Sequence, residues 1–208
     1  MNDNKLLSAN EIKIRSIDWL LEENKNAILS NELLFSKNKR RADIVMLLEN
    51  QVISFEIKGD LDNVKNLQQQ LKDYLRTFDK VNIICTNKLF NRIYNLVPKR
   101  VGIVLFDKEF KIIRSAKINK KLSKNSLIQF CKYNVLLKFL NKNQKHLSTE
   151  EMRIIVAKKL ALNSVKELSY QSLTRKITPL YKIFLKDRGK FTIKEDLLNL
   201  AGEIKAIR

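Results

Sequence analysis

The hydrophobic and polar positions of the chain follow two different periods, which separate strands from helices. Nearly continuous apolar runs at 42–48 and 52–58 indicate two buried strands, joined at 49–51 by a turn in which Asn50 can adopt the left-handed conformation. After Gly59 the apolar residues recur at threes and fours, which predicts an amphipathic helix capped by Asp60 or Asp62. The apolar positions of this helix are Leu61, Val64, Leu67, Leu71, Leu75 and Phe78. The next apolar run, 81–86, predicts a buried strand reached by a crossover and therefore parallel to a neighbour.

Further elements complete an α/β pattern. A capping box opens a first helix at Ser8, which should end within 24–26, and a short strand is expected at 32–35. A hairpin over 101–106 and 111–115 extends the sheet, whereas only helical patterns follow residue 119. These include a long helix at 126–140 and helices opening at Ser148 and Thr192. We therefore predict an αβββαβ core with a mixed sheet at 1–118 and a basic, all-α extension at 119–208.

Three charged residues stand out against the apolar strands. Asp43 opens one arm of the predicted hairpin, and Glu56 and Lys58 lie two positions apart on the other, so they share a face. Two carboxylates held close together repel unless a cation lies between them, and oxygen ligands suit Mg²⁺ or Mn²⁺. The alternative is that these are ordinary polar residues at strand ends. Charged groups within so apolar a strand need a partner or a function, which favours a metal site.

Composition and charge narrow the class of protein. The 208 residues are 44% hydrophobic and contain only four Gly and two Pro, so the chain is long enough for one good core. Its apolar runs are too short for a membrane span or a signal peptide, and we expect a cytoplasmic protein without membrane contact. Cys85 and Cys131 lack metal-binding spacing and are expected to be buried free thiols.

The net charge of +19 is concentrated in one part of the chain. Residues 1–110 contain 18 Lys and Arg against 15 Asp and Glu, whereas residues 111–208 contain 23 against 7. Such an asymmetry is typical of a surface that contacts nucleic-acid phosphates. The chain is also rich in Asn and Ile, and the composition of an AT-rich genome would by itself raise the number of lysines.

The order of elements, together with Asp43 and the Glu56, Lys58 pair, resembles the PD-(D/E)XK nuclease superfamily, which has a restriction-endonuclease-like fold. The resemblance implies that Asp43 and Glu56 bind one or two divalent ions and that Lys58 assists the attacking water. Ala42 stands where many members carry Pro before the first acid. On the crossover helix, Gln70 and the tyrosine four positions later match the Gln-x-x-x-Tyr element of exonuclease-like members.

A narrower resemblance is to a little-characterised bacterial family with this nuclease core and a helical C-terminal portion. It rests on Arg-Ala-Asp-Ile-Val at 41–45, Phe-Glu-Ile-Lys at 55–58, Phe-Asp-Lys-Val at 78–81 and Leu-Val-Pro at 96–98. It covers residues 10–115 well and is looser beyond them, where 131–140 is the best-matching piece.

The hypothesis that follows is a Mg²⁺- or Mn²⁺-dependent DNA endonuclease or exonuclease. Asp43, Glu56 and the backbone carbonyl of Ile57 would hold the ion. Lys58 would position or activate the water. Gln70 would hydrogen-bond near the centre and Tyr74 would stack on or hydrogen-bond the substrate.

Neighbouring residues could extend this site. Glu32 lies where many members of the superfamily carry an additional acid, although it could instead pair with Lys37 or Arg40. The basic turn before Asp43 carries three cationic residues that could contact a phosphate. These are Lys39, Arg40 and Arg41.

Other hypotheses stay open. A catalytically silent nuclease fold could bind nucleic acid or a protein as an adaptor, although clustered carboxylates facing a polyanion gain nothing without a metal. An RNA-directed nuclease is chemically allowed, and the sequence decides neither the strandedness of the substrate nor between a monomer and a homodimer.

Overall fold

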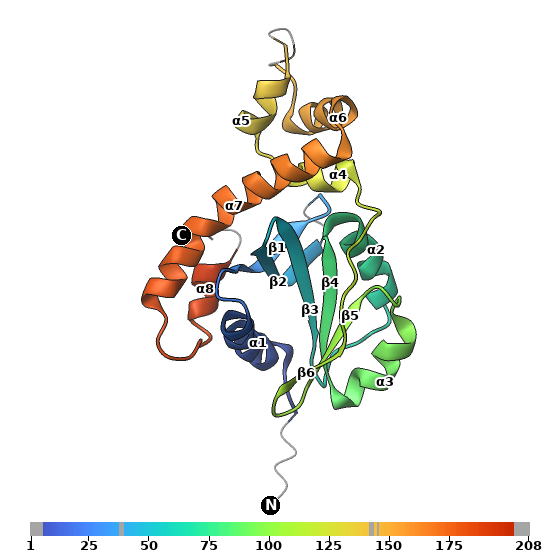
Figure 1. The fold of residues 1–208 in the computed structure, drawn as a ribbon, viewed down its shortest axis with the longest axis vertical. Helices are drawn as coiled ribbons and strands as arrows, with labels where there is room; N and C mark the ends of the chain where they lie inside the picture. The colour runs from blue at the N-terminus through green and yellow to red at the C-terminus, as the bar shows by residue number, and fades with distance from the viewer. Residues whose placement is uncertain (1–5, 38–39, 142–143, 145, 202–208) are drawn as a thin grey trace, which may run out of the picture.

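The computed structural model describes residues 6–37, 40–141, 144 and 146–201 and contains a six-stranded mixed sheet (Figure 1). The strands lie side by side in chain order: β1 (Ile28–Phe35), β2 (Arg40–Leu48), β3 (Gln51–Lys58), β4 (Lys80–Thr86), β5 (Gly102–Phe106) and β6 (Phe110–Arg114). The β3–β4 and β4–β5 pairs are parallel, and the other pairs are antiparallel. The predicted α/β class is confirmed, with the αβββαβ order of the core and its helical extension.

The helices cover both faces and one edge of the sheet. They are α1 (Ala9–Glu23), α2 (Leu67–Thr77), α3 (Asn87–Leu96), α4 (Lys124–Leu127), α5 (Tyr133–Leu136), α6 (Thr149–Lys159), α7 (Leu162–Asp187) and α8 (Asp196–Leu200). The capping boxes predicted at Ser8 and Ser148 are present at the starts of α1 and α6. None of the helices in the described ranges has the length and apolar character needed to cross a membrane.

Side-chain alternation along the strands sends neighbouring residues into two separate cores. Val45 and Leu47 of β2 pack with α2, α3 and the middle of α7, whereas Ile44 and Met46 pack with α1 and the end of α7. A third, smaller core joins α4, α5, α6 and the start of α7. Cys85 and Cys131 are buried free thiols, as predicted.

The end of β3 is fastened to the start of α1 by a close backbone approach. Gly59 follows β3 directly, and a Cβ at this position would lie 2.6 Å from the backbone N of Ala9 and from the backbone O of Leu7. Asp60 strengthens the contact because its N–H donates to the Leu7 carbonyl at 2.9 Å, and its carboxylate accepts from the Leu7 N–H at 2.8 Å. Only glycine fits here, and the clasp fixes α1 beside the strand that carries Glu56 and Lys58.

Three predicted helix boundaries were wrong. The crossover helix begins at Leu67, because the residues after Gly59 form a loop in which Asp62 accepts the Gly59 N–H at 2.7 Å and Leu61 is 74% exposed. The final helix begins at Asp196, because Thr192 is used instead to hydrogen-bond Asp18. Separately from these boundaries, helix α3 was missed altogether.

The third wrong boundary concerns 126–140, which was expected to be one helix. The structure has α4, a 3₁₀ turn at Ile128–Phe130, α5 and a second 3₁₀ turn at Leu137–Phe139. Extended backbone at Cys131 and Lys132 separates the two halves. This break lets Cys131 and Leu136 both face the third core.

The C-terminal residues are built into the sheet as well as forming their own core. Helix α7 crosses beside the β1 edge (Figure 1), placing Leu173 and Ile177 in one sheet core and Phe184 in the other. Asn31 of β1 forms an isolated bridge with Ala201, so the residue that follows α8 also covers this edge. Covering an edge strand removes a site of unwanted pairing.

Replacing Phe184 tests whether α7 is needed by the sheet. Phe184 is fully buried, so Phe184→Ala should lower the free energy of unfolding by about 3–5 kcal/mol. Leu185→Ala, at a neighbouring position that is 47% exposed, should change it by less than about 0.5 kcal/mol. Urea unfolding followed by circular dichroism measures both. Equal, small losses would mean that α7 folds independently of the sheet.

Candidate active site

Three neighbouring strands bring three carboxylates to the same level of the sheet. The pairs Asn31↔Ile44 and Leu33↔Ala42 set Glu32 of β1 across from Asp43 of β2. The β2–β3 register, in which Ile44 pairs with Phe55, then sets Asp43 across from Glu56. Asp43 and Glu56 therefore lie side by side at one end of the β2–β3 pair, where Glu56 meets Tyr74 of α2 and Asp43 meets Lys13 of α1. Glu56 and Lys58 share a face, as predicted from their spacing in the sequence.

Asp43 is held by a backbone donor and by a lysine. Its Oδ2 accepts the Ile57 N–H at 2.8 Å, and its Oδ1 lies 3.2 Å from the Nζ of Lys13. Burial, reinforced by the charge of Glu56, raises the pKa of Asp43 to about 6, although Lys13 and the Ile57 N–H oppose the shift. The charge of Glu56 is thus close enough to disfavour ionisation of Asp43.

Glu56 is buried and both of its oxygens are engaged. The Lys58 Nζ donates to Oε1 at 2.7 Å, and the Tyr74 hydroxyl donates to Oε2. The same hydroxyl lies 3.2 Å from the Arg41 carbonyl. Burial and the charges of Glu56 and Asp43 raise the pKa of Tyr74 well above its usual value, so the phenol stays protonated and serves as a donor. The predicted residues Glu56, Lys58 and Tyr74 therefore meet in one cluster.

Glu32 is placed by an unusual backbone conformation. Its φ of 54° lies in the left-handed region, which is rare for a residue within a strand. Its carboxylate hydrogen-bonds Lys13 and lies 3.6 Å from the Nε of Arg41. Glu32 thus pairs with neither Lys37 nor Arg40, the partners considered from the sequence, and its role as a metal ligand stays a prediction.

Lys13 belongs to the cluster, although the sequence analysis did not identify it. Its side chain is only 4% exposed and reaches from α1 to Glu32 and Asp43. Burial acts to lower the pKa of Lys13, but the two carboxylates outweigh burial and raise it, so the ammonium is charged. A signal was available, because Lys13 lies next to Ile12 and one turn before Ile17 on the buried side of α1.

The remaining predicted residues lie around this cluster. Gln70 is half-buried, one turn before Tyr74 on α2, and its side chain makes no hydrogen bond within the described ranges. Arg40 pairs with Asp73 at 2.9 Å, whereas Arg41 has a 52% exposed side chain. Lys39 lies outside the described residues.

The cluster offers few ligands to a divalent cation. Within the described part of the chain, no three Asp, Glu, His or Cys side chains are arranged to hold a metal, so a site must use fewer side chains. Asp43 and Glu56 supply carboxylate oxygens, and the Ile57 backbone could add a carbonyl oxygen, which is the ligand chemistry of Mg²⁺ and Mn²⁺. Lys13 and Lys58 each pair with one of these carboxylates, so a divalent ion would have to compete with two ammonium groups.

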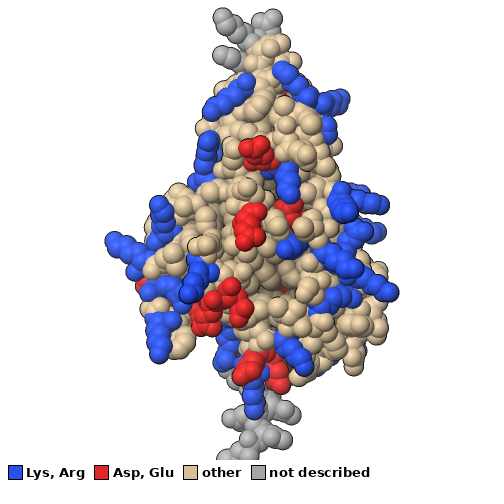
Figure 2. Space-filling view, viewed as in Figure 1, with Lys and Arg blue, Asp and Glu red and all other residues tan. Residues whose placement is uncertain are grey.

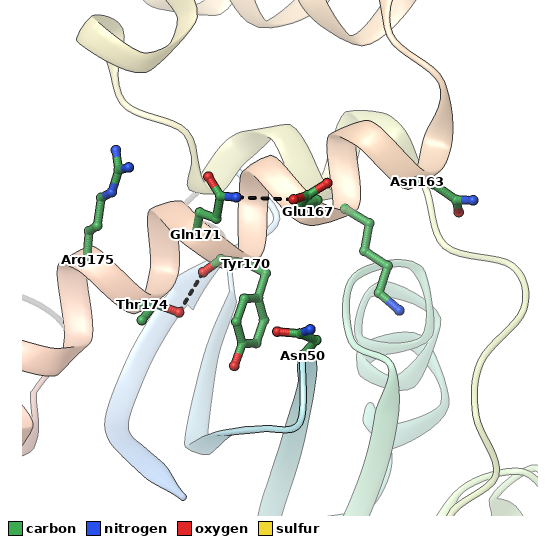
Figure 3. A pocket seen from close by; sticks show the side chains of 8 residues that line it. Asn50, Asn163, Glu167, Tyr170, Gln171, Thr174 and Arg175 are labelled. Carbon is green, nitrogen blue, oxygen red and sulfur yellow. Dashed lines mark hydrogen bonds between the residues drawn. The ribbon is translucent and has the colours of Figure 1, made fainter.

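A separate cavity of about 590 Å³ lies between α7 and the turn joining β2 to β3 (Figure 3). Tyr170 points towards Asn50 in this cavity, and Glu167 accepts a hydrogen bond from Gln171 at 3.3 Å. The turn lies at the opposite end of the β2–β3 hairpin from Asp43, and the cavity shares no lining residue with the carboxylate cluster. We therefore base the candidate site on the cluster.

Comparison with known proteins identifies relatives of the whole chain. A family described as Bacteriophage P4 protein cII matches residues 2–202. Protein cII of Enterobacteria phage P4 is 32% identical over 179 residues, which cover 81% of this chain and 67% of the relative. The SPO1766 protein of unknown function from Silicibacter pomeroyi aligns with 89% of this chain and 98% of its own, at 16% identity and a TM-score of 0.42, which is too distant to support an inference. These names state no activity, so the nuclease resemblance stays a prediction.

The raised pKa of Asp43 gives a testable pH dependence. The folded protein holds the Asp43 proton more tightly than the unfolded chain, whose value is near 3.8. The contribution of Asp43 to the free energy of unfolding is therefore largest at low pH and falls by about 3 kcal/mol as pH rises from about 4 to above 6. Carboxyl ¹³C NMR in metal-free buffer should show Asp43 titrating at about 6. Urea unfolding over the same pH range should show that Asp43→Asn removes this fall in the free energy of unfolding. An NMR titration midpoint of Asp43 near its ordinary value would contradict the crowding of the two carboxylates.

Proposed function

The chain belongs to the bacteriophage P4 protein cII family, and we propose that it is a divalent-metal-dependent nuclease that hydrolyses phosphodiester bonds in DNA. The observation that carries the proposal is the convergence of Asp43, Glu56 and Lys58 at one end of the β2–β3 pair, where Tyr74 also bonds Glu56. A buried pair of carboxylates raises the free energy of the fold, so such a pair is more readily explained by a function than by structure.

The ion would be held by Asp43, Glu56 and the Ile57 carbonyl. When bound, it would lower the pKa of a coordinated water and offset the negative charge that develops on the phosphate. Asp43 is preset for this role because the Ile57 N–H fixes one of its oxygens. Above about pH 6 the Asp43 carboxyl would be ionised, which is the form that binds a metal ion.

Lys58, Tyr74 and Gln70 would act on the substrate and the water. The Lys58 ammonium lies beside Glu56, where it can orient a water molecule or stabilise charge on a phosphate oxygen. Tyr74 remains a proton donor, and its position on α2 is fixed by T-shaped packing against Phe35. The amide of Gln70, which has no hydrogen-bond partner among the described residues, lies one turn before Tyr74 and is available to bond the substrate or the water.

The charge distribution favours a nucleic acid as the polyanionic partner. Figure 2 shows Lys and Arg along both sides of one face, with Asp and Glu gathered between them. Exposed Arg100 and Lys117 are brought together because the Lys117 N–H donates to the Arg100 carbonyl at 2.9 Å. Such side chains position a nucleic acid through its phosphates rather than by reading sequence.

The alternative function is a silent adaptor with the same fold. One observation favours it: Glu56 has no unpaired oxygen, and Lys13 already pairs with Asp43. In an adaptor the carboxylates would need only these lysines, and a divalent ion would have no role. Cleavage with and without metal distinguishes the two functions.

Glu56→Gln and Lys58→Met should abolish cleavage while preserving the fold. Each should reduce the single-turnover rate by at least about 100-fold in Mg²⁺ or Mn²⁺, since each removes a group acting on the developing charge. The substrates are single-stranded, duplex and branched DNA, with RNA as a further arm. Glu167→Gln, an exposed carboxylate on α7, is the matched control and should cut as the wild type does. If the wild type binds DNA no better than Glu56→Gln and neither cuts with metal, the adaptor function is correct.

Arg41→Ala should weaken DNA binding through one lost phosphate contact. Arg41 is the described residue of the basic turn that stays largely exposed beside the cluster, so its loss should lower the slope of log K against log salt by about 1. Fluorescence anisotropy at several salt concentrations measures the slope. Lys25→Ala, exposed beyond the end of α1, should leave it unchanged. An unaltered slope in Arg41→Ala would remove this turn from the DNA path.

A further inference from the structure

We propose that Lys13 is a built-in counter-ion that neutralises Asp43 in the metal-free protein and withdraws to Glu32 when a divalent ion binds. Lys13 would then set the metal concentration at which the site is occupied. The proposal rests on the metal site of the proposed function and adds to it a residue and a form of regulation.

The position of Lys13 is fixed by the fold. Helix α1 is clasped to the end of β3 through Gly59 and Asp60, so the side chain of Lys13 has a defined origin beside the cluster. From there its Nζ reaches Asp43 Oδ1 at 3.2 Å and hydrogen-bonds Glu32. With 4% of its side chain exposed, Lys13 has exchanged water for these carboxylates.

Glu32 gives the ammonium a second place to bind. Its left-handed backbone interrupts the pairing between Asn31 and Leu33, and its side chain is directed to Lys13. The Glu32 side chain is 31% exposed, more than that of Asp43, so an ammonium held by Glu32 alone would be better hydrated. We call Glu32 the holding acceptor, meaning the carboxylate that binds the Lys13 ammonium once Asp43 is occupied by metal. This role accounts for the strained backbone of Glu32.

A divalent ion and Lys13 compete for the same carboxylate. The ammonium satisfies Asp43 without metal, and it repels any second cation within a few ångströms in a partly buried site. Lys58 does not substitute for Lys13, because the Lys58 ammonium pairs with Glu56 and not with Asp43. Arg41 does not substitute for Lys13 either. The carboxylate beside its Nε is that of Glu32, at 3.6 Å.

Lys13→Met separates charge from packing because methionine keeps an unbranched apolar stem. In the full chain, Mn²⁺ should bind Lys13→Met roughly tenfold more tightly than it binds the wild type, as measured by isothermal titration and by the EPR signal of free Mn²⁺. In EDTA the variant should have a lower Tm because Asp43 loses its cation, whereas Glu32 keeps Arg41, and Mn²⁺ should restore the Tm.

Lys166→Met is the matched control. Lys166 pairs with buried Asp79 at 2.6 Å, away from the cluster, so its loss also leaves a buried carboxylate without a cation. Its Tm should fall in EDTA without recovery in Mn²⁺, and its Mn²⁺ affinity should equal that of the wild type. Asp43→Asn should bind no Mn²⁺ in the same range.

Glu32→Gln provides a second variant that retains Lys13. Without its holding acceptor, Lys13 should stay on Asp43 and Mn²⁺ should bind several-fold more weakly. In the Lys13→Met background, Glu32→Gln should cause no further change. A further loss there would make Glu32 a metal ligand and overturn its role as the acceptor for Lys13.

The outcomes separate this inference from the nuclease proposal. Mn²⁺ binding to Lys13→Met that is no tighter than to the wild type would overturn the counter-ion role while leaving the nuclease intact. Tighter binding without DNA cleavage by either protein would uphold the counter-ion role and reject the nuclease. Failure of the wild type, Lys13→Met and Lys13→Met/Glu32→Gln to bind Mn²⁺ would overturn both.

Discussion

The central constraint on this structure is the repulsion between carboxylates that the sheet places side by side. Strand pairing sets Glu32, Asp43 and Glu56 across from one another, and the burial of Glu56 and partial burial of the other two reduce the screening by water. The fold meets the constraint with Lys13 and Lys58, and with the Tyr74 hydroxyl. Each of these groups comes from a different element, so the cluster ties α1, α2 and the three strands together.

The surrounding architecture serves to hold this cluster in place. Gly59 allows α1 to approach β3 closely enough for Lys13 to reach Asp43. The segment 197–201 covers the β1 edge next to the strained Glu32. There the side-chain amide of Asn31 donates to the Leu197 carbonyl at 3.1 Å. The helices after 119 thus pack on the sheet, and the part of the chain after 119 carries most of the net positive charge.

Much of the candidate site could be predicted because it depends on local spacing. Glu56 and Lys58 share a face since side chains alternate along any strand, and Asp43 joins them once the hairpin register is set by its short turn. Lys13 could not be identified with the same ease, since a lysine within an apolar helical stripe gives no indication of which strand it will meet. The left-handed Glu32 gave no signal, because glutamate has no preference for that conformation and only the packing around β1 imposes it.

The sequence by itself determined the αβββαβ order of the core, the hairpin carrying Asp43 and Glu56, and the capping boxes at Ser8 and Ser148, because these follow from periodicity and short-range hydrogen bonds. Only the tertiary structure decided where the crossover helix begins, how 126–140 breaks, and which cations neutralise which carboxylates. Those features depend on contacts between residues far apart in the chain, as when Lys13 meets Asp43, and such contacts arise only when the elements pack.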